Sequence, residues 1–258
     1  MPSTFPDHNI HPEATGIAKK TVDAHQKPEE LVFWSGWFCP FNQRVWIILE
    51  EKGIPYQYKE VNPYAKEESF LKLNPRGLVP TIEYQGKPLY ESTVLCEFLE
   101  DVYLDRPPHV LPKDPYEKAR VRIWADHTSK HIIPAWHRLL QLQTKEDQDK
   151  ARQDLYEAQR KLAEEIKGPY FAGEEFGLVD VLNVPWVSRD HVLREYREYK
   201  REGAGENYAR WADLLEKRDS VVKTTSDKDK LMVIYDRYLA GTANSEVAKA
   251  IREGKPLP

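Results

Sequence analysis

Residues 31–53 read LVFWSGWFCPFNQRVWIILEEKG, and this stretch decides the fold of the first part of the chain. The apolar run 31–34 is short and rich in strand-forming residues, and Pro40 follows at a position that the first turn of a helix tolerates. Apolar residues then recur at helical spacing over residues 43–52, and Gly53 is typical of the position just after a helix. The stretch therefore predicts a strand that is followed almost at once by a helix.

The residues after Gly53 continue this alternation of short elements. Residues 74–77, NPRG, are a strong turn signal, and residues 85–87, QGK, have the spacing of a hairpin loop. In chain order the further elements that we expect are a strand at 55–61, a helix at 66–73, strands at 81–84 and 88–90, and a helix that Ser92 caps. The order strand–helix–strand–helix–strand–strand–helix predicts a small α/β domain.

A proline-rich break at residues 106–112 separates this region from the rest of the chain, and we interpret it as a linker. Residues 1–28 mix polar residues and prolines without periodicity, so we expect an extension that is disordered or lies over the surface. The chain is therefore predicted to consist of an N-terminal extension at 1–28, an α/β domain at 29–106 and an all-helical domain at 113–258.

Helical periodicity dominates the second domain. Apolar residues recur at intervals of four, three, four and four over residues 151–166, which predicts an amphipathic helix with a narrow apolar stripe. Tyr116, Ala119 and Ile123 begin another apolar face, and this helix is expected to run towards a kink at Pro134.

Composition excludes several classes of protein. Lys and Arg number 38 against 42 Asp and Glu, and no basic run occurs, which argues against nucleic acid as a partner. No stretch approaches the roughly 20 apolar residues of a membrane span. Two cysteines, Cys39 and Cys96, are too few for a disulfide framework or, alone, for a zinc site, and we expect no metal. These features, with no apolar signal-peptide core in the first thirty residues, predict a cytoplasmic protein.

Cys39 is the candidate for reactivity because it lies between the predicted strand and the predicted helix. The unsatisfied N–H groups and positive dipole end of a helix favour a thiolate there, and the thiolate is the nucleophilic form of cysteine. Asn42 stands where a dithiol motif would have its second cysteine, so a dithiol cycle within the motif is excluded. The alternative is a buried structural cysteine, and for Cys96, on the apolar face of the Ser92 helix, we favour that interpretation.

Two further clusters could hold a peptide-like ligand. Pro80 enters a strand from a turn, and a cis peptide there would leave the backbone of Val79 available to a bound peptide. Glu91 can hold an ammonium, while Ser92 can present its hydroxyl and a helix-start N–H to a carboxylate, so the pair suits an α-amino-acid end. Taken separately, these residues could equally be a strand-edge proline and an ordinary helix cap.

In this order the three clusters resemble the thioredoxin-like domain of glutathione transferases. The segments 39–41 (CPF), 74–80 (NPRGLVP) and 90–92 (YES) are most similar to omega-class and related fungal cysteine-type transferases. The most specific likeness covers residues 33–103, and the helical remainder matches in length and pattern. The resemblance implies an α/β thioredoxin-like N-terminal domain plus an all-α C-terminal domain.

The resemblance also implies a role for each motif residue. Cys39 would meet the sulfur of glutathione and form a mixed disulfide with it. Val79, beside a cis Pro80, would pair with the cysteinyl backbone of glutathione, and Glu91 with Ser92 would take the γ-glutamyl end.

Lys66 matches the lysine that faces the glycine carboxylate of glutathione in the family, although a solvated helix lysine is an open alternative. Phe41 is expected to pack under the glutathione site rather than to react.

The helical domain carries a less specific likeness. The family caps one helix with Ser or Thr and places an Asp three residues on; here Gly177 takes the cap position and Asp180 is retained. Four residues are candidates for the substrate pocket by the resemblance: Trp136, Trp186, Arg189 and Tyr238. Arg189 could attract an acidic substrate, or it could form a surface ion pair.

The function implied is that of a glutathione-dependent thiol transferase, which removes glutathione from a substrate through a Cys39–glutathione mixed disulfide. Dehydroascorbate reduction is a related reaction, and the sequence does not choose between them. Conjugation of glutathione to electrophiles and non-catalytic carriage of aromatic ligands are the alternatives. Glutathione is expected as co-substrate beside a small hydrophobic or aromatic substrate, and the resemblance implies a homodimer.

Overall fold

The computed structural model describes residues 10–257, which divide into two compact units. The first unit contains residues 10–109 together with Asp219–Leu231, and the second contains Val110–Arg218 together with residues 232–257. The boundary after His109 falls inside the expected linker. The assignment of 113–258 as a whole to the helical domain differs from the structure, because Asp219–Leu231 packs with the first unit.

A mixed β-sheet forms the centre of the first unit. In the described part of the chain it has four strands, in the order β2-β1-β3-β4: β1 (Leu31–Ser35), β2 (Gln57–Glu60), β3 (Thr81–Tyr84) and β4 (Lys87–Tyr90). β1 is parallel to β2 and antiparallel to β3, and β3 is antiparallel to β4. Phe33, on the central strand, pairs with Tyr58 and Ile82, and all three side chains are buried. The α/β architecture predicted from the sequence is confirmed.

The predicted hairpin joins β3 and β4, but its loop is shorter than the expected 85–87, because Lys87 belongs to β4. Tyr84 pairs with Lys87, which leaves Gln85 and Gly86 as a two-residue connection. Both residues have positive φ, +52° and +73°, as the tightest hairpin turns require. A Cβ at Gly86 would meet no atom within 4 Å, so glycine is favoured there by the backbone conformation and not by lack of space.

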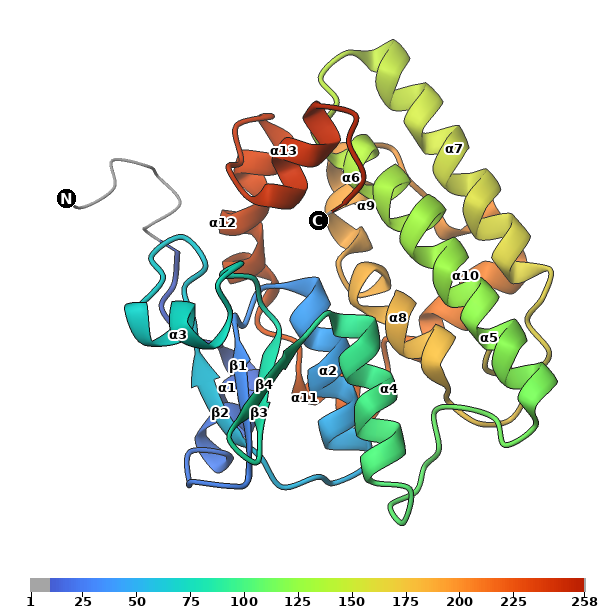
Figure 1. The fold of residues 1–258 in the computed structure, drawn as a ribbon. Coiled ribbons are helices and arrows are strands. Elements are labelled where there is room, and N and C mark those ends of the chain that lie inside the picture. The colour runs from blue at the N-terminus through green and yellow to red at the C-terminus, as the bar shows by residue number, and fades with distance from the viewer. Residues whose placement is uncertain (1–9, 258) are drawn as a thin grey trace. The chain divides into compact units, whose positions relative to one another are not determined.

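Helices α2 (Pro40–Glu51), α3 (Glu68–Leu73) and α4 (Ser92–Val102) complete the α/β arrangement, and α2 packs against α4 (Figure 1). Pro40 is the first residue of α2, and Gly53 follows its end with a φ of +56°. The expectation that Ser92 caps α4 is wrong: Ser92 is the first helical residue and Glu91 is the cap, with a φ of +78°. The local sequence did not show this because a cap residue with positive φ is normally glycine or asparagine.

The segment expected to be an irregular extension contains a helix, α1 (Gly16–Ala24). Residues 1–9 of that segment lie outside the described part of the chain. α1 packs on α11 (Asp219–Lys223), where the hydroxyl of Thr21 donates to the carbonyl of Lys223 at 2.8 Å. Its buried residues are Ala18, Thr21 and Val22, and only Val22 is a large apolar residue, so the segment has no long apolar periodicity and the sequence analysis missed the helix.

The second unit is helical, as predicted. Its elements are α5 (Pro115–His127), the π-helix η2 (Thr128–Ile132), α6 (Ile133–Gln141), α7 (Lys145–Ala163), α8 (Leu178–Val187), α9 (Asp190–Tyr196), the 3-10 helix η3 (Arg201–Ala204), α10 (Glu206–Leu215), the part of α12 (Lys228–Leu239) from residue 232 onward, and α13 (Glu246–Arg252). Within residues 10–257, none of the helices has both the length and the apolarity that crossing a bilayer requires.

The apolar face expected on α5 points outward. Tyr116 and Ile123 are 71% and 64% exposed, and Ala119 between them is exposed as well, whereas Val121 and Ala125 are buried. Helical spacing identifies residues that share a face, but it does not say which face meets the core.

The helix expected to run from Tyr116 towards a kink at Pro134 is interrupted by a π-helix before it reaches that residue. η2 occupies residues 128–132, directly before α6, and Pro134 is in the first turn of α6. Proline has no N–H to donate to the preceding turn, and a wider turn of this kind is one of the usual ways in which a helix changes its course.

Asp180 organises the start of α8. Its carboxylate accepts hydrogen bonds from the N–H of Gly177 at 2.8 Å, the N–H of Phe171 at 2.9 Å and the indole N–H of Trp211 at 2.7 Å. Gly177 caps the helix as predicted, but only Asp180 contributes a side chain, because glycine has none. Burial raises the pKa of Asp180 to about 6 despite these donors.

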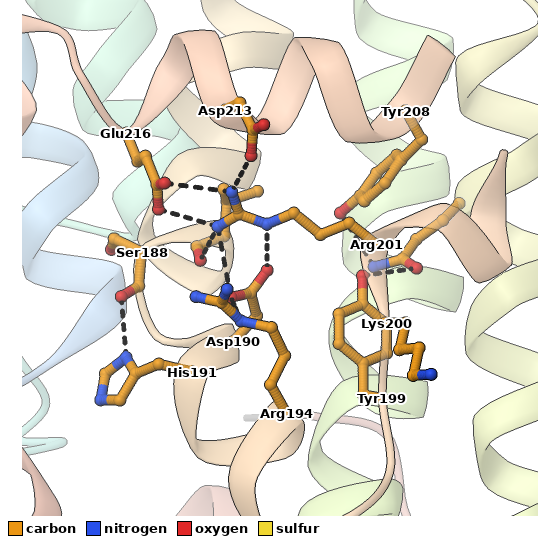
Figure 2. Close-up of polar contacts among 12 residues, drawn as sticks. Ser188, Asp190, His191, Arg194, Tyr199, Lys200, Arg201, Tyr208, Asp213 and Glu216 are labelled. Carbon is orange, nitrogen blue, oxygen red and sulfur yellow. Dashed lines mark hydrogen bonds and ion pairs between the residues drawn. The ribbon is translucent and has the colours of Figure 1, made fainter. Parts of the chain in front are cut away.

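A buried arginine holds together several elements of the second unit. Figure 2 shows the guanidinium of Arg201 between Asp190, Asp213 and Glu216. Its Nε lies 2.6 Å from Asp190 and one Nη lies 2.8 Å from Glu216, while the same Nη donates to the carbonyl of Val187 at 3.2 Å. These contacts join α8, α9, η3 and α10, so we assign Arg201 a structural role.

Candidate functional site

Cys39 lies at the start of α2, where the sequence placed it. It is the N-cap residue with extended backbone (φ −77°, ψ 123°), and its carbonyl accepts the helical hydrogen bond from Gln43 at 3.2 Å. The side chain is partly exposed. A thiol at this position meets the positive end of the helix dipole, as the reactivity hypothesis requires.

The loop between β1 and α2 is held by hydrogen bonds around Gly36. The carbonyl of Gly36 accepts from the N–H of Cys39 at 3.0 Å and from the side-chain amide of Asn42 at 2.9 Å. Asn42 is buried, so the residue that replaces a second cysteine serves to fix the loop. Trp37 is anchored at both its nitrogens, to the carboxylate of Glu60 at 3.0 Å and to the carbonyl of His11 at 2.8 Å.

Cys96 is a core thiol, as predicted. It is fully buried on α4, and burial raises the pKa of its thiol to about 12. At neutral pH the Cys96 sulfur is therefore protonated and unreactive, which leaves Cys39 as the thiol available for chemistry.

The turn before β3 has the predicted backbone. The Val79–Pro80 peptide bond is cis, and β3 begins at Thr81, so Val79 precedes the paired part of the strand. The side-chain amide of Asn74 donates to the carbonyl of Leu78 at 3.0 Å and to the hydroxyl of Thr81 at 3.1 Å. Asn74 is fully buried, so this residue holds the turn that presents Val79 and Pro80.

Lys66 approaches the same turn. Gly77 has a φ of +63°, and a Cβ at that residue would lie 2.8 Å from both Cδ and Nζ of Lys66. The lysine side chain therefore crosses the turn next to Gly77 rather than extending into solvent from the region before α3. This position is compatible with the role that the resemblance implies for Lys66.

Glu91 and Ser92 stand at the start of α4. The carboxylate of Glu91 forms an ion pair with the guanidinium of Arg76, and its side chain is 48% exposed. Ser92 is buried, and its hydroxyl accepts a hydrogen bond from Arg44 at 3.2 Å. Glu91 thus keeps an accessible carboxylate, while the hydroxyl of Ser92 is held by the buried side chain of Arg44.

Arg44 is the residue that the sequence analysis missed. It lies on α2, is 1% exposed, and its Cζ is 5.3 Å from the centroid of the Phe41 ring. Phe41 packs against this cation, in keeping with the expectation that it supports the site. Burial lowers the pKa of Arg44 to about 10, so the guanidinium remains charged at neutral pH. No sequence signal pointed to Arg44, because a single arginine within a helix usually reaches solvent.

Three of the four pocket candidates of the second unit form one aromatic cluster. Trp136, Trp186 and Tyr238 surround His137, with ring centroids 5.1, 6.5 and 6.2 Å from its imidazole. The indole N–H of Trp186 donates to Nε2 of His137 at 3.4 Å. All four side chains are buried, and burial lowers the pKa of His137 to about 3. The cluster is consequently part of the packed interior of the unit.

Arg189, the fourth candidate, is not on the surface. Its side chain is buried, and Nη1 donates to the carbonyl of Pro185 at 2.7 Å and to the hydroxyl of Ser188 at 3.3 Å. The surface ion pair considered from the sequence is therefore wrong.

Within residues 10–257, His, Cys, Asp and Glu side chains nowhere gather in a group of three or more that could hold a metal ion.

Comparison with known proteins matches each unit to a domain of one family. The family described as glutathione S-transferase, N-terminal domain, matches residues 38–102, and the family described as glutathione S-transferase, C-terminal domain, matches residues 110–218. The crystal structure of glutathione transferase Omega 3C from Trametes versicolor is similar, with 53% identity and a TM-score of 0.86 over 90% of this chain and 100% of that one.

Curated relatives include plant and animal proteins. Probable glutathione S-transferase parC from Nicotiana tabacum is 32% identical over 79% of this chain and 93% of its own length. Glutathione S-transferase omega-1 from Sus scrofa is 35% identical over 70% of this chain and 76% of its own length.

Proposed function

Because the chain belongs to the glutathione S-transferase family, whose co-substrate is glutathione, we propose that it is a cysteine-type thiol transferase. The observation that carries the proposal is the partly exposed Cys39 at the N-terminus of α2. A thiol at this position favours disulfide exchange with glutathione, whereas transferases that conjugate glutathione use a hydroxyl to stabilise its thiolate.

The proposed cycle has two exchanges. The Cys39 thiolate attacks the glutathione sulfur of a disulfide between glutathione and the substrate; the S–S bond breaks, and the substrate leaves as a thiolate that takes up a proton. A second glutathione thiolate then attacks the same sulfur of the Cys39–glutathione disulfide. This step releases oxidised glutathione and restores the Cys39 thiolate.

We assign glutathione to the α/β unit. In this proposal Glu91 and Ser92 bind the γ-glutamyl end, and the backbone of Val79 beside Pro80 pairs with the cysteinyl part. The ammonium of Lys66 faces the glycine carboxylate. The accessible carboxylate of Glu91 and the position of Lys66 next to Gly77 support this arrangement.

The helical unit is assigned the second substrate, a small hydrophobic or aromatic molecule; dehydroascorbate is a further candidate. Four buried residues are proposed to border this site as the packed layer behind its surface: Trp136, Trp186, Arg189 and Tyr238. A cytoplasmic location is proposed because neither cysteine is in a disulfide. When cells are quenched in acid and the protein is then unfolded and labelled, both cysteines are expected as free thiols, and a disulfide found there would contradict the proposed location.

We also propose that the protein is a homodimer. Tyr116, Ala119 and Ile123 form an exposed apolar stripe on α5, of the kind that a partner subunit covers. Light scattering should give the mass of two chains for the wild type and of one chain for Ile123→Glu. A monomeric wild type would contradict the proposed dimer.

The decisive assay is glutathione-dependent reduction of hydroxyethyl disulfide by the wild type and by Cys39→Ser at equal concentration. Cys39→Ser should lose thiol transfer, because a hydroxyl cannot form the mixed disulfide, and it should retain glutathione binding. Cys96→Ala is the matched control and should keep the wild-type rate. Equal rates for the wild type and Cys39→Ser would exclude Cys39 from the mechanism and leave conjugation or ligand carriage as the function.

A further inference from the structure

Arg44 is a buried cation next to the reactive end of α2. It lies five residues after Cys39 on the same helix and is 1% exposed. Removing a charge from water is costly unless the charge has compensating partners. The partners of Arg44 therefore indicate why a charge is kept there.

Two of its partners belong to the proposed glutathione site. Nη1 donates to the hydroxyl of Ser92 at 3.2 Å, and Cζ stands 5.3 Å from the ring centroid of Phe41. Ser92 and Cys96 are four residues apart and so share a face of α4, which lies beside α2 (Figure 1). The guanidinium is thus placed between the reactive end of α2 and the start of α4.

Arg44 also interacts electrostatically with both thiols of the chain. Arg44 interacts with Cys39 and with Cys96, and each thiolate would favour its charged form. Because burial raises the pKa of Cys96 to about 12, that sulfur stays protonated at neutral pH. Of the two thiols, Cys39 is consequently the one whose anion the positive charge can stabilise.

We propose that Arg44 is a positioning residue with two tasks: it provides the positive charge behind the Cys39 thiolate, and it fixes the Ser92 hydroxyl for the γ-glutamyl end of glutathione. The inference rests on the proposed function. It adds that one buried side chain couples the reactive sulfur to the ligand-binding helix.

The charge acts at a defined step of the cycle. In the second exchange the glutathione thiolate attacks the glutathione sulfur of the mixed disulfide, and the electron pair of the breaking bond goes to Cys39. A cation near the Cys39 sulfur stabilises this leaving thiolate and thereby speeds its release. Arg44 suits this task because its charge persists at the pH at which glutathione reacts.

The test compares two substitutions of the same residue. Arg44→Gln retains a donor for Ser92 but removes the charge, and Arg44→Lys retains the charge but removes the planar donor fork. The readouts are the pH midpoint of Cys39 alkylation by iodoacetamide, followed by peptide mapping, and the affinity for glutathione. Arg44→Gln should raise the midpoint by about 1 pH unit or more. Arg44→Lys should keep the wild-type midpoint but bind glutathione at least about threefold more weakly.

Two control variants separate positioning from general destabilisation. Lys52→Met removes another buried cation at the other end of α2, where Lys52 pairs with Glu100 at 2.8 Å. Cys96→Ala removes the second thiol near Arg44. Both should leave the alkylation midpoint unchanged, even where the melting temperature falls.

An unchanged midpoint in Arg44→Gln overturns the electrostatic task, and so does an equal rise in Lys52→Met. If Arg44→Gln does not fold, Arg44→Lys provides the test. Because lysine keeps the positive charge, an alkylation midpoint raised by a full pH unit in Arg44→Lys also overturns the electrostatic task. Unchanged glutathione affinity in Arg44→Lys overturns the second task. Failure of the proposed function is seen separately, as equal rates of hydroxyethyl disulfide reduction by the wild type and Cys39→Ser.

Discussion

Glu91 adopts a backbone conformation that disfavours every residue except glycine, and this permits a sharp test of its role. Its φ of +78° with a ψ of 106° places the Cβ in a strained position at the cap of α4. Strain of this kind costs about 1–3 kcal/mol and persists where the surrounding structure or a function requires the side chain. We therefore expect that the Glu91 side chain is kept for ligand binding at the expense of stability.

The perturbation is a pair of substitutions, Glu91→Ala and Glu91→Gly. Both remove the carboxylate and its ion pair with Arg76, which contributes at most about 1 kcal/mol because both side chains are nearly half exposed. Only the glycine relieves the strain of about 1–3 kcal/mol, less about 1 kcal/mol for its greater freedom in the unfolded chain. The glycine variant should therefore be more stable than the alanine variant by about 1 kcal/mol, or about 2–4 °C in melting temperature.

Binding should respond differently from stability. Both variants lose the same partner of the glutathione ammonium, so both should bind glutathione more weakly by about 1–2 kcal/mol, which is roughly 5- to 30-fold. Titration calorimetry measures the affinity, and thermal unfolding followed by circular dichroism measures the stability.

Gln85 offers the matched control. It also has a positive φ, +52°, but it lies in the exposed loop between β3 and β4. Gln85→Gly should be more stable than Gln85→Ala while both keep the wild-type affinity for glutathione. The reasoning is refuted if Glu91→Gly is less stable than Glu91→Ala, or if either Glu91 variant binds glutathione as tightly as the wild type.

Two further predictions concern Lys66 and His137. Lys66→Ala should weaken glutathione binding about three- to tenfold but leave the affinity for an analogue with an amidated glycine unchanged, because only the carboxylate would meet the ammonium; equal losses for both ligands would contradict it. His137 has a pKa lowered by burial from 6.5 to about 3, so between these values the unfolded chain binds the extra proton and stability rises with pH. Urea unfolding should show that lowering the pH from 7 to 5 costs the wild type about 2 kcal/mol more than it costs His137→Gln, and an equal loss in both would argue against the assignment.

The backbone around Cys39 and the turn before β3 could be predicted because the sequence patterns that indicate them are local. The strand before Cys39, Pro40 after it and the turn at 74–77 each depend on a few adjacent residues with restricted backbone preferences. The structure confirms the helix start at Pro40 and the cis Val79–Pro80 bond. Roles for the side chains at these positions remain proposals, since they concern a ligand.

The errors at α5 and α1 share one origin. Helical spacing showed that Tyr116 and Ile123 lie on one face of α5, but their burial depends on what packs there, and the face is exposed. α1 was missed because it packs on a segment about two hundred residues away, where the hydroxyl of Thr21 donates to the carbonyl of Lys223. In both places the deciding energy comes from packing between distant segments, which periodicity does not report.

The amino-acid sequence by itself determined the order of the elements from β1 to α4, the position of Cys39 before a helix and the absence of a second cysteine from its motif. These follow from short-range backbone preferences and from covalent order. Only the tertiary structure decided that Asp219–Leu231 packs with the first unit, that Glu91 rather than Ser92 caps α4, and that the charge of Arg44 is buried next to Ser92. The reason is physical: the surroundings of a side chain are set by long-range packing, and a charge is tolerated in the interior only where other segments bring it partners.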